Sequence, residues 1–367
     1  MDVNWQNVRD SLQPDEAAIE FVSFRIYDKG WTDTIQYAAL VLRPGMEAPV
    51  WVPISLNEES MLAADMIEFG HAQALVRHLY VIHGETLYNS IWKPLEKVLE
   101  GVKTIYYSPS GLLHNVAFNA VPAGENKRLM DIYDFNLVST TREIVSLKTK
   151  TAQAPRSAVI YGGLSYEYIT ENYWVYMEGT NTESQRIFQL LNTNRIPAIL
   201  YNGNRGNKES FINLDGRGTG IIHLATHNFF HDDIERILEV QTFENPLMKS
   251  GLVFSDDIIF SYDIAQMNLL GTELVVLSAC SSARGIVNNS EGVFGLPRAF
   301  KLAGAQTLLM SLWEVDDEAT SILIIAFYEN WLSGMSKQEA FRAAQRWLRS
   351  TLRFASPFYW AAFVSMD

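Results

Sequence analysis

Two short segments of the chain end in side chains that together could perform nucleophilic catalysis. Residues 274–277 form a continuous apolar run followed by small residues and Cys280, and residues 221–225 are an apolar run that closes on Thr226 and His227. Cys280 is the only cysteine among 367 residues. An imidazole beside a thiol converts it to the nucleophilic thiolate at neutral pH. The pair therefore indicates acyl transfer, with Cys280 as the nucleophile and His227 as the base.

Both runs are typical of strands buried on both faces of a parallel sheet. Open α/β sheets present their reactive groups at the carboxyl ends of such strands, which is where Cys280 and His227 stand. If the two strands are neighbours, the thiol and the imidazole share one edge of the sheet. The competing hypothesis is that a lone cysteine is a small buried hydrophobe. The second strand with the same design favours chemistry over packing.

Composition limits the function classes. Hydrophobic residues make up 48% of the chain, enough for two ordinary domains or one large α/β unit. The formal net charge of -13 argues against a nucleic-acid binder, because phosphate recognition needs a basic face. One cysteine excludes an intrachain disulfide and a cysteine-rich zinc site. The start of the sequence has no signal pattern and no apolar run of about 18 residues occurs, so we expect a cytoplasmic protein without a membrane segment.

The order of predicted elements favours an α/β fold. Alternating residues at 17–27 and 34–42 around a turn predict an antiparallel hairpin, and helical spacing at 60–80 and 85–100 predicts helices. The polar stretch 148–157 is the expected domain boundary. Strands then alternate with helices as far as the C-terminus, including a helix expected at 293–303. This rhythm predicts a mostly parallel sheet covered by helices on both faces.

Several ordered motifs resemble one known family. They are YYSPSGLLHNVAFNAVP at 106–122, HLATH at 223–227, LSACSSARG at 277–285, EG at 291–292, GLPRAFKLAGAQTLLMSLWEVDDEAT at 295–320 and PFYWAAFV at 357–364. Together they resemble the CHAT family, the caspase-like cysteine proteases described as caspase HetF associated with TPRs. The resemblance runs over roughly residues 75–367.

The resemblance implies a caspase-like (caspase-hemoglobinase) fold with three parts. Residues 1–75 would be a linking helix and β-hairpin segment, 75–150 a pseudo-caspase half, and 156–367 the active protease half. The chain would then be the C-terminal part of a bacterial protein that carries tetratricopeptide repeats.

The family also implies a catalytic dyad, which falls on His227 and Cys280. Cys280 Sγ would attack the scissile carbonyl while His227 takes the thiol proton and later protonates the leaving amine, and water would hydrolyse the thioester. The backbone N–H groups of Asn228 and Cys280 would form the oxyanion hole. Asn228 departs from the family pattern, where glycine commonly follows the histidine. A backbone carbonyl could orient the imidazole, so no third acidic residue is required.

The fold implies a pocket for the residue before the cleaved bond. Its candidate lining comes from the loop after the first protease strand, the residue two before the cysteine, and the loop after the strand 306–313: Gly162, Gly163, Ser278, Trp313, Glu314, Asp316 and Asp317. Carboxylates there would favour a Lys or Arg side chain. The alternative is that Asp316 caps the following helix and that Asp317 and Glu318 complement the helix dipole.

Three histidines four residues apart, His223, His227 and His231, also raise a metal hypothesis. Residues 220–226 are strand-like and a loop is expected at Asn228, which would scatter the three rings. We therefore expect no metal and no cofactor.

Two function classes remain open. The first is a regulated intracellular cysteine endopeptidase that cleaves one or a few proteins, with family links to bacterial antiviral defence and cell death. Its expected partners are a protein substrate such as a gasdermin-like effector, a tetratricopeptide-repeat region, and a regulatory protein or RNA-guided complex. The second is a catalytically silent caspase-like scaffold. The presence of both His227 and Cys280 favours the first.

Overall fold

The protein folds into two compact units. The computed structural model describes residues 3–56, 72–149, 155–167, 174–230, 245–278, 285–288 and 292–367. The first unit comprises Met1–Ala152, Val287–Gly292 and Met366–Asp367, and the second comprises Gln153–Ile286 and Val293–Ser365. The division expected from the sequence, with limits at residues 75, 150 and 156, stays a prediction.

The first unit is built on a mixed sheet with strand order β3-β2-β1-β4-β5. β1 pairs antiparallel with β2 as the hairpin predicted from residues 17–42, and β1, β4 and β5 run parallel. Its elements are α1 (Trp5–Ser11), β1 (Glu16–Tyr27), β2 (Trp31–Leu42), β3 (Val50–Ile54), α3 (Ala72–Arg77), α4 (Gly84–Leu87), β4 (Thr104–Ser108), β5 (Asp134–Leu137) and α5 (Glu143–Thr149).

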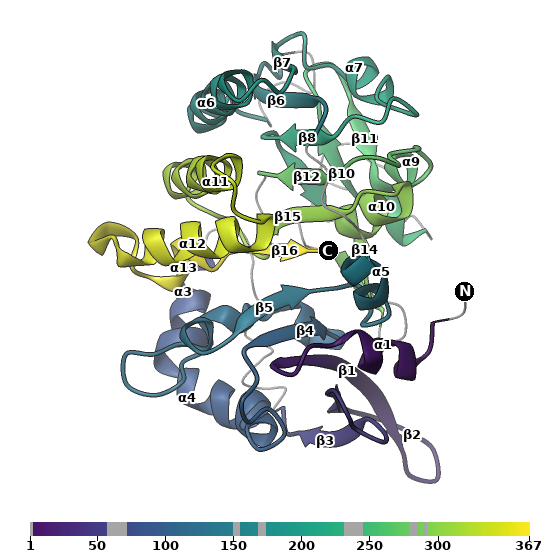
Figure 1. Ribbon diagram of the computed structural model, residues 1–367. Helices are drawn as coiled ribbons and strands as arrows, with labels where there is room; N and C mark the ends of the chain where they lie inside the picture. The colour runs from purple at the N-terminus through teal and green to yellow at the C-terminus, as the bar shows by residue number, and fades with distance from the viewer. Residues whose placement is uncertain are drawn as a thin grey trace. The chain divides into compact units, whose positions relative to one another are not determined.

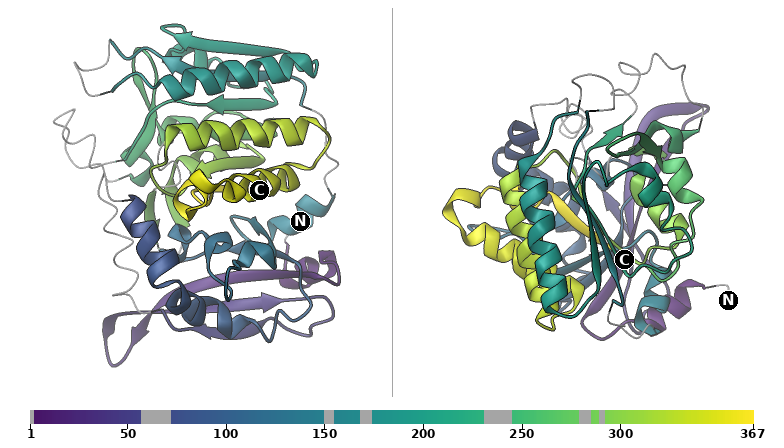
Figure 2. Two further views of the ribbon diagram at one scale, coloured as in Figure 1. Left: turned by 90° about the vertical axis from the view of Figure 1, so that its left-hand side faces the viewer. Right: turned by 90° about the horizontal axis from the view of Figure 1, so that it is seen from above.

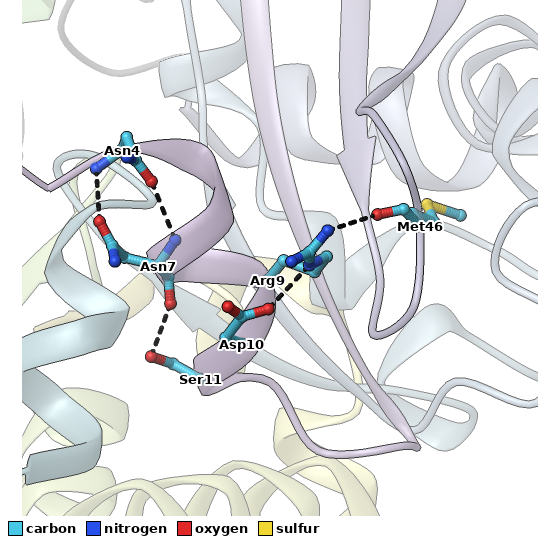
Figure 3. A network of polar contacts seen from close by, with 6 residues as sticks. All are labelled: Asn4, Asn7, Arg9, Asp10, Ser11 and Met46. Atoms are coloured by element: carbon cyan, nitrogen blue, oxygen red, sulfur yellow. Dashed lines mark hydrogen bonds and ion pairs between the residues drawn. The ribbon is translucent and has the colours of Figure 1, made fainter.

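The N-terminal helix α1 shows how local chemistry fixes an element of this unit. The side chain of Asn4 accepts from the backbone N–H of Asn7, and the side chain of Asn7 accepts from that of Asn4, which closes a capping box (Figure 3). The guanidinium of Arg9 donates to the Met46 carbonyl at 3.1 Å. These bonds satisfy the free N–H groups at the start of the helix and tie its middle to the chain after β2.

The second unit holds both strands singled out from the sequence. Its described elements are β6 (Ala158–Leu164), α6 (Glu178–Thr193), β7 (Ala198–Gly203), α7 (Lys208–Ile212), β8 (Ile221–Leu224), β9 (Asn228–Phe230), β10 (Ser250–Val253), β11 (Ile258–Phe260), α9 (Ser261–Ala265), β12 (Leu274–Leu277), α10 (Leu296–Ala303), β15 (Thr307–Ser311), α11 (Asp317–Leu332), α12 (Lys337–Ser350), α13 (Pro357–Trp360) and β16 (Phe363–Met366). Two short strands, β13 (Gly285–Asn288) and β14 (Gly292–Gly295), follow β12 in the chain.

The main sheet of the second unit has strand order β16-β15-β12-β8-β6-β7. β15, β12, β8, β6 and β7 pair in parallel. Every residue of β6, β8, β12 and β15 is buried, as expected for strands covered on both faces. β8 and β12 are direct neighbours, with Leu277 opposite Leu224. The adjacency on which the sequence analysis depended is therefore present.

Helices cover both faces of this sheet. α6, α11 and α12 lie on one face, and α7, α9 and α10 lie on the other (Figures 1 and 2). The view from above in Figure 2 shows the strands as a layer between these two sets of helices. The unit is thus a three-layer α/β structure, in agreement with the expected mostly parallel sheet flanked by helices.

Local details differ from the sequence prediction in two places. The segment 85–100 is not one helix: α4 gives way to a π-helical stretch at Tyr88–Trp92 and a 3₁₀ turn at Lys93–Leu95, where a proline interrupts the pattern. The helix expected at 293–303 begins only at Leu296, with Pro297 in its first turn. Of the helix expected at 60–80, residues 60–71 lie outside the described chain.

Within the parts of the chain that the structure describes, no helix combines the length and the apolarity that crossing a membrane requires.

Candidate active site

His227 stands where the sequence placed it, just beyond the carboxyl end of β8. The strand ends at Leu224, and the buried residues Ala225 and Thr226 carry the chain to the half-buried His227. The His227 carbonyl accepts from the N–H of Val253 at 2.9 Å, which joins this turn to β10. The imidazole is therefore carried on backbone that is hydrogen-bonded to a second sheet.

A backbone carbonyl contacts the imidazole, which is the arrangement that would make a third acidic residue unnecessary. Nε2 of His227 lies 2.7 Å from the carbonyl oxygen of Val175. A carbonyl oxygen only accepts, so Nε2 carries the proton, and in the neutral ring Nδ1 has the free lone pair. Nδ1 is thus the atom of His227 that can take a proton from a nucleophile.

Two aromatic side chains contact the imidazole. The ring of Tyr166 lies 4.9 Å from it between centroids, and the ring of Trp174 lies 5.1 Å from it. The Tyr166 hydroxyl lies 2.8 Å from Thr226 Oγ1, and that threonine hydroxyl donates to the Val253 carbonyl at 2.5 Å. The residue before His227 is therefore tied both to Tyr166 and to β10.

Burial lowers the pKa of His227 from its ordinary value, while the Val175 carbonyl and the charge of Asp317 act in the opposite direction. The pKa of Asp317, whose side chain is only partly covered, is raised, first by partial desolvation and then by repulsion from Asp316 and Glu183. Burial raises the pKa of Tyr166 to about 12, against hydrogen bonding with Thr226 and with the backbone of His227. A neutral imidazole beside a neutral phenol is the form expected at pH 7.

Cys280 lies outside the described residues, and so does His231. The chain is described up to Ser278, whose N–H donates to the Leu224 carbonyl at 3.0 Å. Ser278 therefore continues beside β8 past the end of β12, and Cys280 follows two residues later. Ser278 is 6% exposed, and its hydroxyl has no hydrogen-bond partner in the described structure.

Asn228 begins a strand and not the expected loop. It is the first residue of β9, which pairs antiparallel with β10 so that Asn228 stands opposite Leu252. Because Val253 donates to the His227 carbonyl, this pair is of the type whose own N–H groups point away from the partner strand. The N–H of Asn228 is therefore directed away from β10.

Gly162 and Gly163 lie within β6 and not in the loop expected after it, and both pack closely against α6. A Cβ on Gly162 would lie 2.6 Å from the Thr180 carbonyl oxygen, and one on Gly163 would lie 2.8 Å from Asn181 Cβ. Gly163 also has φ of +61°, in the left-handed region. Its N–H donates to Thr180 Oγ1 at 3.0 Å. These glycines let the N-terminal part of α6 approach the strand end.

The residues between β15 and α11 separate into different environments. Trp313 is 2% exposed and its indole N–H donates to the Phe358 carbonyl. Asp316 is the N-cap of α11 and accepts from the Ala319 N–H at 2.9 Å. Glu318 pairs with Arg353. Glu314 is half-buried and Asp317 is exposed, and of these acidic residues only Asp317 influences the pKa of His227.

His223 is fully buried in the core, and its ring nitrogens face Glu183 and Tyr328 and not His227. Its Nε2 lies 2.9 Å from Glu183 Oε1, with both side chains almost fully buried, and its Nδ1 lies 3.5 Å from the Tyr328 hydroxyl. Within the described ranges, no group of three or more histidine, cysteine or acidic side chains could hold a metal ion.

Three residues at the site were not predicted from the sequence: Tyr166, Trp174 and Val175. Val175 contributes a backbone atom, which any residue type supplies, and the two aromatic residues resemble ordinary core positions. The one usable signal was the glycine pair at the end of β6, because the chain that follows it carries Tyr166.

Comparison with models of known protein families identifies the family of this chain. A model of the CHAT domain matches residues 81–367. This chain belongs to the CHAT domain family. Two curated relatives, both called tetratricopeptide repeat protein 28, match over 95 residues at 37% identity in Mus musculus and 38% in Homo sapiens. Each match covers 26% of this chain and 4% of the relative, so the chain spans a small part of those proteins.

Solved structures with low sequence identity share the fold. The Arg-specific cysteine proteinase gingipain R superposes with a TM-score of 0.50 and 7% identity, covering 83% of this chain and 69% of that chain. Two structures of the Saccharomyces cerevisiae separase–securin complex give TM-scores of 0.56 and 0.58 at 11% and 10% identity, covering 99% of this chain and 30% of theirs. The CHAT domain described here therefore has the fold of caspase-like cysteine proteases.

Proposed function

We propose that this CHAT domain is a cysteine endopeptidase in which His227 activates Cys280. The observation that carries the proposal is the bond from His227 Nε2 to the Val175 carbonyl at 2.7 Å, which leaves Nδ1 as the proton acceptor at the carboxyl end of β8. β12, the strand that leads to Cys280, is the direct neighbour of β8. Two residues span at most about 7 Å, so Cys280 is within reach of that edge from Ser278.

In the proposed reaction Cys280 Sγ forms a bond to the scissile carbonyl carbon and His227 Nδ1 takes the thiol proton. That proton passes to the leaving amine when the C–N bond breaks, and water then cleaves the thioester. We propose that the N–H of Asn228 is one donor of the oxyanion hole, because it points away from β10 and is not used in that strand pair. The N–H of Cys280 would be the second donor.

For the substrate pocket we propose that Asp317 selects a basic side chain. It is exposed at the start of α11 and close enough to His227 to act on its pKa. Asp316 accepts a hydrogen bond as the N-cap of α11 and Glu318 pairs with Arg353, so among the three acidic residues at 316–318 Asp317 is the one placed to meet Lys or Arg. Ser278, Gly162, Gly163 and Glu314 remain candidate neighbours of that pocket.

We further propose a regulated role inside the cell, with one or a few protein substrates. The tetratricopeptide repeats in the names of the curated relatives support a repeat region or a regulatory protein as partner. A place in a bacterial defence or cell-death pathway, with a gasdermin-like effector as substrate, follows from the family resemblance.

The sole cysteine permits a direct test of the dyad. Iodoacetamide alkylation of the full chain reports Cys280 alone, because no other thiol is present. We expect rapid alkylation near neutral pH in the wild type and a strong decrease in His227→Gln. Fluorogenic peptides with Lys or Arg at the cleavage position should be hydrolysed by the wild type and by Ser282→Ala, and faster than peptides with an apolar residue there. None of them should be hydrolysed by Cys280→Ala. The proposal is contradicted if Cys280→Ala hydrolyses the peptides as fast as the wild type, or if His227→Gln is alkylated at the wild-type rate.

A further inference from the structure

We propose that Tyr166 is a positioning residue for His227, which fixes both the backbone that carries the imidazole and the orientation of the ring. The importance of this role for turnover rests on the proposed function. The role itself concerns the histidine alone and can be measured without any substrate.

The hydroxyl of Tyr166 acts on the backbone. Thr226 Oγ1 donates its only proton to the Val253 carbonyl at 2.5 Å, so the Tyr166 hydroxyl must be the donor in its 2.8 Å contact with Thr226. This chain of bonds joins the loop after β6, the end of β8 and β10. Thr226 is fully buried, so the bonds are protected from competing water.

The ring of Tyr166 acts on the imidazole. It lies 4.9 Å from the His227 ring with an interplanar angle of 58°, and Trp174 adds a second aromatic contact at 5.1 Å and 43°. Turning the imidazole over would break its 2.7 Å bond to the Val175 carbonyl and would disturb both aromatic contacts. The aromatic contacts therefore hold the ring in the orientation that keeps Nδ1 unprotonated.

The chain offers a matched control for an ordinary buried tyrosine. Tyr161 belongs to β6, is fully buried like a core residue, and stacks on Tyr201 at 5.0 Å instead of on His227. A general loss of packing would affect variants at Tyr161 and Tyr166 alike. A positioning role would affect His227 only when Tyr166 changes.

The first experiment follows the His227 ring by ¹⁵N NMR in Cys280→Ala, with the resonance assigned from its absence in His227→Gln. We expect the wild-type ring to show one neutral tautomer, protonated at Nε2. In Tyr166→Leu both tautomers should appear, and the pKa of His227 should move up toward its ordinary value because the ring that excludes water is gone. Tyr161→Phe should leave the His227 signals unchanged.

The second experiment separates the hydroxyl from the ring. Tyr166→Phe keeps the aromatic contact and Thr226→Val removes the next link, so both should slow alkylation of Cys280 about tenfold and lower kcat with KM unchanged. If Tyr166→Leu does not fold, these two variants carry the test. The inference is overturned if Tyr166→Phe and Thr226→Val match the wild type in tautomer and alkylation rate, or if Tyr161→Phe shifts His227 equally. If the wild-type thiol shows no dependence on His227, the proposed protease fails, while the NMR comparison still decides the role of Tyr166.

Discussion

Nε2 of His227 lies 2.7 Å from the carbonyl oxygen of Val175, a residue 52 positions earlier in the chain. This contact assigns the proton of the neutral imidazole to Nε2 and leaves Nδ1 as the acceptor. The loop after β6 and the end of β8 therefore determine together which nitrogen can act as a base. The orientation does not depend on a carboxylate.

The first prediction concerns the titration of His227. Burial lowers its pKa in the folded protein, so the unfolded chain takes up this proton at a higher pH than the folded chain. Unfolding is thereby favoured as the pH falls through the ordinary value of about 6.5, and the free energy of unfolding should decrease in that range. Urea titrations at several pH values should show a weaker decrease for His227→Gln than for the wild type. An equal decrease in both would contradict the lowered pKa.

The second prediction concerns Asp317. Its negative charge raises the pKa of His227, so Asp317→Asn should lower that pKa further below the ordinary value. The measurement is an NMR titration of His227 in the Cys280→Ala background. Glu318→Gln is the control, because the Glu318 carboxylate pairs with Arg353. A rise in the His227 pKa in Asp317→Asn, or an equal change in Glu318→Gln, would show that Asp317 does not act on the imidazole.

The third prediction separates Asp316 from its neighbour. Asp316 caps α11 through the Ala319 N–H, and loss of such a cap costs about 1 kcal/mol. Asp316→Ala should therefore lower the free energy of unfolding by about that amount, and Asp316→Ser should restore most of it. Chemical denaturation measures both. No difference between alanine and serine would mean that the cap does not contribute to stability.

The fold could be predicted largely from strand composition. The apolar runs that form β8 and β12 were recognisable because both faces of each strand are buried, and the end of β8 marked the place of His227. The placement of Cys280 stays a prediction. The hairpin of β1 and β2 followed from alternation around Lys29, which adopts a positive φ of 54°. A strand buried on both faces has a continuous apolar sequence and a strand buried on one face an alternating one, so burial of this kind can be predicted from residue types.

The surroundings of His227 could not be predicted in the same way. The contact with Val175 uses a main-chain oxygen, which leaves no trace in residue type. Tyr166 and Trp174 meet the imidazole only because β6 lies beside β8, and sequence spacing does not encode that meeting. Asn228 was expected in a loop, but its pairing with Leu252 depends on β10, which is distant in the chain.

The fourth prediction concerns Gly163. Its φ of +61° disfavours any side chain, and an added Cβ would lie 2.8 Å from Asn181 Cβ. Gly163→Ala should therefore destabilise the protein by about 1–2 kcal/mol. Gly216, with φ of +67° and no atom within 4 Å of an added Cβ, is the control for backbone strain alone. Thermal unfolding should show a larger loss for Gly163→Ala than for Gly216→Ala, and equal losses would remove the steric contribution from α6.

The buried pair of Glu183 and His223 gives the last prediction. Glu183 comes from α6 and His223 from β8, their side chains lie 2.9 Å apart, and their exposed fractions are 2% and 0%. Removing one partner leaves a buried polar side chain without the other, which costs about 1–3 kcal/mol, whereas replacing both by apolar groups of similar shape is often nearly neutral. Glu183→Leu should therefore be destabilising by about that amount.

Adding His223→Leu to Glu183→Leu should recover part of that loss, because neither member of the pair is then buried without the other. The Tyr328 hydroxyl loses its 3.5 Å contact with His223 Nδ1, which limits the recovery. Lys208 and Asp257 form the surface control: their ion pair at 2.8 Å is partly exposed, and Lys208→Ala should cost about 0–1 kcal/mol. Urea denaturation of the single and double variants measures the difference. A double variant as unstable as Glu183→Leu would mean that the volume of the pair, and not its mutual compensation, supports the packing of α6 on β8.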